Sequence, residues 1–366
     1  MLKLSGHGIG LLNAQYRSVL KKCLLLNVMA ASLIYALPAN AENAHANASG
    51  VNNDSGVATA ITHLNGKMGL EIGEHKDIGS LYVDKSFKNS IYSEGSRQET
   101  GGDNQYGPWI INYQNVYIGY KYYDGTQKEV TNTIEIANRH NTNGDIDFSG
   151  GGVVVSGSEK GTTDTLLQVR NTIFTNNSVS SSTTETESFV ASGGAITTYS
   201  TKDNFIKNST FHANYAMSGA TAEGGAVSNV SAETGENSSS LTPTVGKLTS
   251  ENNAYKNNYA GNKTSEEKLS QFNGVNAEIA QGGAIYNSGV LTSTADTFIK
   301  NQAFGENAYG GAIRNAIEDG ISKDDSGKVT LTNTAGVENF VGNSAKGADK
   351  AYGGAISNLA AFSATN

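Results

Sequence analysis

Two aspartates in the segment NTNGDIDFSGGG have a spacing that suits cation binding. Asp145 and Asp147 stand two residues apart, so both side chains would face the same way on a strand. Carboxylate oxygens are ligands that Ca²⁺ prefers, but its cage takes about six to eight oxygens, and the sequence places no further ligands beside this pair. The flanking Asn and Gly residues are also typical of a turn. A turn is therefore the first expectation, and a calcium site is the alternative.

The other charged and imidazole side chains show no pattern typical of a site. Asp324 and Asp325 lie between lysines in an apparent hairpin loop, where solvated charge is expected. On strands, His212 and Arg314 would alternate to the outside. The histidines after residue 41 have no metal-ligand spacing to one another: His45, His63, His75, His140 and His212.

The sequence also lacks a phosphate-binding loop, a nucleophile elbow and a cysteine site. We therefore predict that the chain has no catalytic, cofactor-binding or metal-binding residues, no cofactor and no enzyme activity.

A repeat organises the second half of the chain. Gly-Gly followed by Val or Ala and an aliphatic residue begins at six positions, 28 to 58 residues apart: Gly151, Gly193, Gly224, Gly282, Gly310 and Gly353. Four of these have the fuller form Gly-Gly-Ala-(Ile or Val)-x-Asn, ending at Asn229, Asn287, Asn315 and Asn358. The irregular period indicates a constant unit carrying insertions of variable length.

A second motif, an aromatic residue followed three positions later by Asn, alternates strictly with the glycine doublets. It occurs at Phe174 and Asn177, Phe211 and Asn214, Tyr255 and Asn258, Phe298 and Asn301, and Phe340 and Asn343. The extra length of the longer units lies in polar segments, residues 178–192, 231–246, 261–281 and 318–327. We expect these segments to be surface loops.

The shortest unit, residues 282–309, shows what one turn of the chain requires. It reads as strands over 284–287, 290–295 and 297–303, with a turn at Ser288 and Gly289. Such a unit can bury its apolar side chains only against similar units above and below. The sequence therefore predicts an all-β fold, a right-handed parallel β-helix of about five to eight coils. The glycines would form corners, the aliphatic and aromatic residues a core, and the Asn residues hydrogen-bonded ladders.

Residues 60–150 are rich in β-forming residues but lack the repeat. Eight of the chain's 17 tyrosines and its single tryptophan, Trp109, lie there, and two interpretations fit them. The segment is either an atypical N-terminal cap with the first coils, as repeat folds commonly have, or an aromatic platform for a sugar ring. We expect the cap.

The N-terminus has the three parts of an export signal. Lys3, Arg17, Lys21 and Lys22 precede an apolar run over residues 23–37, and Ala39-Asn40-Ala41 suits cleavage. We therefore predict a signal peptide over residues 1–41 and a flexible leader over 42–59. Its removal would change the net charge from −8 to −12 and take away Cys23, the only cysteine. An acidic chain without cysteines argues against a nucleic-acid partner and excludes disulfides.

The strict alternation of the two motifs resembles the repeat of chlamydial polymorphic membrane proteins, which belong to autotransporter passenger domains. The resemblance covers residues 151–366, and its doublets begin at Gly193, Gly224, Gly282, Gly310 and Gly353, with the five aromatic-x-x-Asn pairs between them. Gly151 opens a variant unit with Val for Ala, and Tyr255 replaces Phe. Both changes keep an apolar side chain.

The resemblance implies an exported adhesin on the outer membrane surface, or outside the cell, of a Gram-negative-type bacterium. Its partners would be protein or glycan ligands on host or neighbouring cells. Family members normally continue into a C-terminal β-barrel. No such tract follows Asn358, so we expect a truncated passenger that would associate with the outer membrane only through the missing barrel.

An enzyme is the alternative function, because β-helices also carry polysaccharide lyases and glycoside hydrolases. Those activities need paired acidic groups, or acids linked by calcium, with a basic partner on one face. The chain has five arginines and shows no such convergence. We therefore favour the adhesin.

Overall fold

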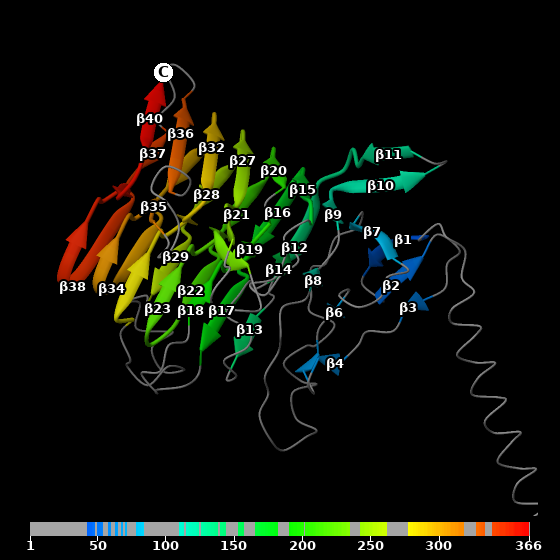
Figure 1. Ribbon diagram of the computed structural model, residues 1–366, viewed down its shortest axis with the longest axis horizontal. Helices are drawn as coiled ribbons and strands as arrows, with labels where there is room; N and C mark the ends of the chain where they lie inside the picture. Colours follow the sequence, from blue (N-terminus) through cyan, green and yellow to red (C-terminus); the bar gives the residue numbers. More distant parts are fainter. Residues whose placement is uncertain are drawn as a thin grey trace, which may run out of the picture. The chain divides into compact units, whose positions relative to one another are not determined.

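The computed structural model is built from β-strands throughout its described residues (Figure 1). It describes strands between residues 42 and 156 and most of residues 165–365, apart from 182–189, 201, 235–241, 262–276, 318–326 and 334–338. The described strands belong to one unit, Glu42–Asn366. Within this part of the chain, no helix is long and apolar enough to cross a membrane. The predicted signal, residues 1–41, lies outside the described residues.

Four sheets, which we number I to IV in the order that the chain visits them from β15 onward, contain most of the strands. Sheet I has the order β3 (Ala58–Thr59), β2 (Gly50–Asn53), β1 (Glu42–Asn47), β7 (Ile78–Val83), β9 (Asn115–Ile118), β15 (Leu167–Arg170), β20 (Asp203–Lys207), β27 (Lys247–Glu251), β32 (Val290–Thr294), β36 (Lys328–Thr332) and β40 (Phe362–Thr365). Sheet II has the order β12 (Ile134–Ala137), β16 (Thr172–Thr175), β21 (Thr210–His212), β28 (Ala254–Lys256), β33 (Thr297–Ile299) and β37 (Phe340–Val341).

Sheet III has the order β13 (His140–Asn143), β17 (Ser178–Ser181), β22 (Tyr215–Met217), β29 (Tyr259–Gly261), β34 (Gln302–Tyr309), β30 (Ile279–Gln281), β23 (Thr221–Glu223) and β18 (Val190–Ser192), with β38 (Ser344–Tyr352) also paired to β34. Sheet IV has the order β39 (Ile356–Asn358), β35 (Ile313–Asn315), β31 (Ile285–Asn287), β24 (Val227–Asn229), β19 (Ile196–Thr198), β14 (Val154–Ser156), β8 (Ile110–Asn112) and β6 (Leu70–Glu71).

Three antiparallel hairpins stand apart from these sheets. They are β4 (His63–Leu64) with β5 (Lys67–Met68), β10 (Tyr120–Tyr123) with β11 (Thr126–Glu129), and β25 (Ala232–Thr234) with β26 (Thr242–Thr244). Strands β1, β2 and β3 also pair antiparallel with one another, at the edge of sheet I. The segment 42–59, which we expected to be a flexible leader, thus contributes three strands.

From β15 onward the chain visits sheets I, II, III and IV in a fixed order and then returns to sheet I. Each strand pairs in parallel with the strand that occupies the same sheet one circuit later, as β27 pairs with β32 and β31 pairs with β35. Apart from a register shift between Gly305 and Asn307 where β34 pairs with β38, the registers from β15 onward are continuous. Equivalent residues of successive circuits therefore form columns across the sheets. The prediction of an all-β fold with parallel pairing is confirmed.

The compact unit of residues 282–309 contains four strands, β31 to β34, whereas the sequence predicted three; circuits in which sheet III has two separate strands contain five. The expected strand over 297–303 is two strands, β33 and β34, because the backbone turns at Lys300, where φ is +54°. The preceding strand ends at Thr294 because Ala295 has the same left-handed backbone. Residues other than glycine that adopt the left-handed backbone leave no recognisable pattern in the sequence, so the sequence did not predict the extra corner.

The core lies between sheets I, II and IV. The aromatic residues of the second motif form a single stack through it, with neighbouring ring centroids 4.8 to 5.0 Å apart and ring planes within 7° of parallel: Phe174, Phe211, Tyr255, Phe298 and Phe340. The separation matches the distance between paired strands, about 4.8 Å. The stack confirms that these residues fill the core.

Both predicted Asn ladders are present. After sheet II, the side-chain Nδ2 of each Asn donates to Oδ1 of the next circuit's Asn at 3.0 Å, through Asn177, Asn214, Asn258, Asn301 and Asn343. After sheet IV, the corresponding distances are 2.6 to 2.8 Å, through Asn229, Asn287, Asn315 and Asn358. Most of these amides lie away from solvent, and the bonds between them offset the cost of burying them.

The two glycines of each doublet have different tasks. Gly282 has a φ of +63°, the left-handed backbone that turns the chain into sheet IV. Gly283 needs space instead, because a Cβ atom there would lie 2.2 Å from the carbonyl oxygen of Gly311 in the next circuit. Both predicted roles of the doublet, the corner and the close approach, are confirmed.

Sheet III folds back on itself as two limbs. The first limb contains β17, β22 and β29, the second contains β18, β23 and β30, and the long strands β34 and β38 run through both. The limbs pack on small side chains, among them Ala277, Ala280, Ala303 and Ala308. Small residues let two layers approach closely. Residues 182–189 and 262–276 lie in the sequence between the first-limb and second-limb strands of two circuits.

Candidate functional site

Most of the candidate site residues named in the sequence analysis lie outside the part of the chain that the structure describes. Asp145, Asp147, Asp324, Asp325 and Trp109 lie outside the described residues. His212 is exposed on β21, where its Nε2 lies 3.3 Å from the side-chain amide nitrogen of Asn257. No group of three or more His, Cys, Asp or Glu residues that could hold a metal occurs among the residues that the structure describes.

Arg314 differs from the prediction. Its side chain leaves β35 on the face opposite the core residue Ile313, as alternation requires, yet it is only 6% exposed. The second limb of sheet III covers it, because Gln281 and Tyr309 at the ends of β30 and β34 contact the guanidinium group. Strand alternation predicts direction but does not reveal such a covering layer, so the expectation that Arg314 would be outside was wrong in its exposure.

Three neighbours fix the guanidinium group. Its Nε donates to Oε1 of Gln281 at 3.1 Å, and its Nη1 donates to Oγ of Ser357 at 2.6 Å. Its central carbon lies 4.6 Å from the ring centroid of Tyr309. A cation over an aromatic face is stabilised further when both are shielded from water. Arg314 is therefore held in one orientation between sheets III and IV.

Gln281 also links Arg314 to a carboxylate. Its Nε2 donates to Oε1 of Glu223 at 3.3 Å, and Ser192 Oγ donates to Oε2 of Glu223 at 3.1 Å. Burial lowers the pKa of the Arg314 guanidinium, and the negative charge of Glu223 opposes that change. One positive and one negative charge thus balance each other across the Gln281 amide.

Tyrosines and a serine complete this group. Ser228, Tyr286 and Arg314 occupy the same outward position on three neighbouring strands of sheet IV. Ser228 is fully buried, and its Oγ has no hydrogen-bond partner among the described residues. Tyr286 is 5% exposed. We call this set the arginine corner, and its residues are Glu223, Ser228, Gln281, Tyr286, Tyr309 and Arg314.

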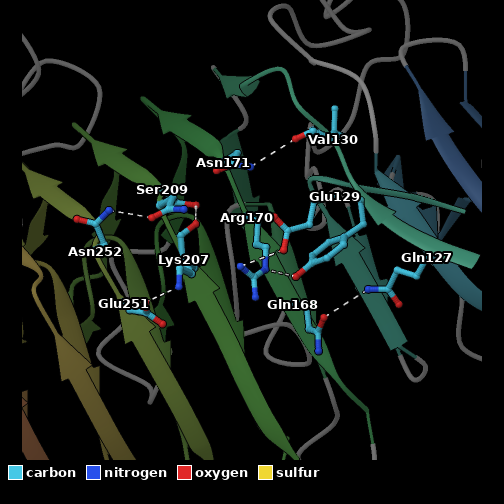
Figure 2. A network of polar contacts seen from close by, with 12 residues as sticks. Gln127, Glu129, Val130, Gln168, Arg170, Asn171, Lys207, Ser209, Glu251 and Asn252 are labelled. Atoms are coloured by element: carbon cyan, nitrogen blue, oxygen red, sulfur yellow. Dashed lines mark hydrogen bonds and ion pairs between the residues drawn. The ribbon is translucent and has the colours of Figure 1, made fainter.

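A second polar network lies on the outer face of sheet I, as Figure 2 shows. Arg170 on β15 forms an ion pair with Glu129 on β11 at 3.1 Å, and its Nε donates to the hydroxyl of Tyr120. The guanidinium carbon also lies 4.8 Å from the ring centroid of Phe205. Gln127 and Gln168 add a contact of 3.5 Å. These contacts join the β10–β11 hairpin to sheet I.

The aromatic rings near this network cover one another. Tyr82 and Tyr117 stack with centroids 5.0 Å apart and planes 15° apart, and Tyr120 meets Tyr117 edge-on at 5.9 Å. A sugar platform needs an open ring face, whereas here one face of Tyr117 lies against Tyr82 and a guanidinium group lies over Phe205. The arrangement supports a structural role for these tyrosines.

A buried carboxylate, Asp296, stands at the corner between sheets I and II. Its Oδ1 accepts a hydrogen bond from the backbone N–H of Asn253 and its Oδ2 accepts one from Ser293 Oγ, both at 2.7 Å. Burial raises its pKa to about 6, although these hydrogen bonds act in the opposite direction. Ser209 and Asn253 hold the equivalent place in earlier circuits and bond in the same ladder. Asp296 therefore belongs to a third, less regular ladder.

A weak signal for the arginine corner is present in the sequence. Position x of the Gly-Gly-Ala-(Ile or Val)-x-Asn motif is small and polar at Ser228 and Ser357 but large at Tyr286 and Arg314. The change from a small to a large side chain at this position marks the place of the arginine corner. No family model, no curated protein and no solved structure matches the chain.

Proposed function

We propose that this chain is a right-handed parallel β-helix that acts as a non-enzymatic surface adhesin. Three features support the fold: the fixed order of sheets I to IV, the in-register pairing of each circuit with the next, and the closed core between three sheets. Parallel crossovers are overwhelmingly right-handed. The eight strands of sheet IV correspond to the upper end of the predicted five to eight coils.

The observation that carries the adhesin proposal is that each circuit combines constant motif residues, which form the scaffold, with connections of variable length. The Gly, aromatic and Asn residues of the motifs form corners, stack and ladders and lie inside. The insertions occur at a few points of the circuit, mainly between the limbs of sheet III and between sheets IV and I. A scaffold that repeats while its connections vary is typical of a binding protein. Many weak contacts along such a scaffold add up through avidity.

The resemblance to the polymorphic membrane protein repeat supports the same proposal and extends it to location. Export by the predicted signal would place the chain on the outer membrane surface or outside a Gram-negative-type cell. Its ligands would then be proteins or glycans on host or neighbouring cells. A binding role also fits the arginine corner, because that corner holds one carboxylate among its described residues, whereas glycoside hydrolysis uses two.

Loop deletion tests the proposal. The purified chain should bind cultured host cells, and a variant with residues 235–241 and 262–276 replaced by short glycine-serine linkers should bind several-fold more weakly. These boundaries spare β25, β26, β29 and β30. Thr330→Ala, an exposed change on sheet I, serves as the control. Equal binding by the loop variant and the control would count against the proposal.

A further inference from the structure

The corner between β32 and β33 differs from the equivalent corners of the two preceding circuits. Ala295-Asp296 forms it, whereas Asn208-Ser209 and Asn252-Asn253 hold the same places between sheets I and II. The residues of the earlier corners are polar and neutral, and here an alanine and a carboxylic acid replace them. We call residues 294–297 the Asp296 corner. The repeat alone does not account for either of its two exceptional residues.

Ala295 adopts a backbone that alanine disfavours. Its φ is +54°, and Asn208 and Asn252 have φ of +51° and +55° at the equivalent places. Asn tolerates the left-handed backbone better than alanine, because its short polar side chain can hydrogen-bond. Nδ2 of Asn252 indeed donates to Oδ1 of Asn208 at 2.8 Å, and Ala295 has no amide that could continue this contact. The Asp296 corner therefore holds backbone strain that the earlier corners reduce.

The carboxyl group of Asp296 occupies the place of an amide. Oδ1 of Asn253 accepts a hydrogen bond from the backbone N–H of Ser209 at 2.7 Å, and Oδ1 of Asp296 accepts one from the backbone N–H of Asn253 at the same distance. Oδ2 of Asp296 accepts a hydrogen bond from Ser293 Oγ at 2.7 Å. The equivalent atom of Asn253 is Nδ2, which lies 2.9 Å from Ser250 Oγ. An oxygen of Asp296 thus stands where the preceding circuit has an N–H donor.

A proton on Oδ2 of Asp296 would restore that donor. Nδ2 of Asn253 also donates to the backbone carbonyl oxygen of Ile206 at 2.9 Å. Ile206 pairs with Ser250, and Ser250 pairs with Ser293 in the next circuit. The carbonyl at the equivalent place for Asp296 is therefore that of Ser250. A protonated carboxyl can donate to a carbonyl oxygen, whereas an ionised carboxyl only accepts. The hydrogen bonding of the Asp296 corner is thus complete with the protonated acid and lacks one donor with the ionised acid.

The surroundings of Asp296 do not compensate a negative charge. Its side chain lies away from solvent, and no lysine or arginine among the described residues forms an ion pair with it. Strands β27 and β32 present the hydroxyls of Ser250 and Ser293. From β28, Tyr255 is the titratable group that faces Asp296, and burial, followed by the charge of Asp296, raises the pKa of Tyr255. Burial likewise raises the pKa of Asp296 to about 6.

We propose that the Asp296 corner is a proton-controlled joint between the stacked circuits, closed when the carboxyl is protonated and opening locally when it is ionised. Opening gives the carboxylate access to water, releases the left-handed backbone of Ala295 and breaks the hydrogen bond from Asn253 to Asp296. Such local openings require less free energy than global unfolding. The chain is therefore more tightly closed in mildly acidic than in neutral surroundings. This inference does not depend on the proposed adhesin function.

Amide hydrogen exchange of the full chain, measured by mass spectrometry and corrected for the intrinsic pH dependence of exchange, tests the proposal. Protection of residues 290–299 should fall about tenfold between about pH 5 and pH 7.5, because a pKa of 3.8 in the open form and of about 6 in the closed form changes the open population by that factor. Residues 203–212, which contain the equivalent corner Asn208-Ser209, are the internal reference. Their protection should change less than about twofold.

Four variants separate the carboxyl from the strain. Asp296→Asn should abolish the pH dependence in residues 290–299, and so should Asp296→Ser, which introduces the residue type of Ser209. Asp349→Asn is the matched control, because the Asp349 side chain is 71% exposed, and it should keep the wild-type fall. Ala295→Asn should raise protection several-fold at both pH values and leave the fall in place, since backbone strain does not titrate.

Three results would overturn the proposal. The first is protection of residues 290–299 that does not change between the two pH values. The second is an equal fall in residues 203–212, which would show that ionisation acts on the whole fold and not at a joint. The third is a wild-type pH dependence in Asp296→Asn, which would assign the effect to another group.

Discussion

Replacing the buried Asp296 by asparagine should stabilise the protein at neutral pH. Asp296 is 3% exposed, and its pKa is raised to about 6 from an ordinary value of 3.8. At pH 7 and above, the folded protein must therefore keep a carboxylate charged in a site that disfavours charge. The amide introduced by Asp296→Asn would retain an Oδ1 acceptor for the N–H of Asn253 without the charge. Asn253 itself occupies the equivalent place one circuit earlier.

The magnitude follows from the two pKa values. Each pH unit between them corresponds to about 1.4 kcal/mol, so the interval from 3.8 to about 6 corresponds to about 3 kcal/mol. Between these values the folded state binds more protons than the unfolded state, so stability falls as pH rises through this window. Below it both states are protonated, and above it both are ionised. The advantage of Asp296→Asn should thus be largest above pH 7 and smallest near pH 3.

Urea unfolding followed by circular dichroism measures this difference. The free energy of unfolding of Asp296→Asn minus that of the wild type should rise by about 3 kcal/mol between about pH 3 and pH 7.5. Asp203→Asn is the control, because the Asp203 side chain is 88% exposed and its replacement should leave the difference near zero at both pH values. A difference for Asp296→Asn that does not change with pH would refute the reasoning.

Three further predictions concern the repeat. Asn258→Ala should destabilise the chain by at least about 3 kcal/mol in urea unfolding. The change removes two ladder hydrogen bonds and leaves the buried amides of the neighbouring circuits without these partners. A loss below about 1 kcal/mol would contradict the ladder's importance. Gly283→Ala should prevent soluble expression, since its Cβ would lie 2.2 Å from a backbone oxygen. In Gly342→Ala the nearest atom to the new Cβ is 3.4 Å away, so this variant should lose only about 1 to 2 kcal/mol of stability through left-handed backbone strain. Equal soluble expression of the two variants would refute this prediction. Phe211→Ala should lose about 3 to 5 kcal/mol in the same unfolding assay, and a smaller loss than for an exposed substitution would argue against a continuous stack.

Features that recur in every circuit were predictable from the sequence. The doublets, the aromatic stack and the Asn ladders each appear several times at matching places, and repetition allows a single position to be interpreted through its equivalents. Phe298 and Asn301 could be assigned to core and ladder for that reason. Parallel pairing followed as well, because only stacked copies of the unit bury its apolar face.

Corners without glycine were not predictable in the same way. Ala295 and Lys300 adopt φ of +54° although neither residue favours that backbone, and equivalent places elsewhere hold Asn252 and Asn257. Ladder bonds at the adjacent Asp296 and Asn301 fix the backbone there, so tertiary contacts override the local preference. Local propensity therefore identified the strands but miscounted them.

The arginine corner was missed for a different reason. Alternation along β35 correctly directs Arg314 away from the core, but its burial depends on a second layer that returns through β30 and β34. That layer exists because Ala280, Ala303 and Ala308 let the limbs of sheet III close on each other. These alanines look unremarkable in the sequence, since alanine is also common at exposed positions. A covering layer built from small residues thus converts an expected surface arginine into a buried, oriented one, at the variable position of the repeat motif.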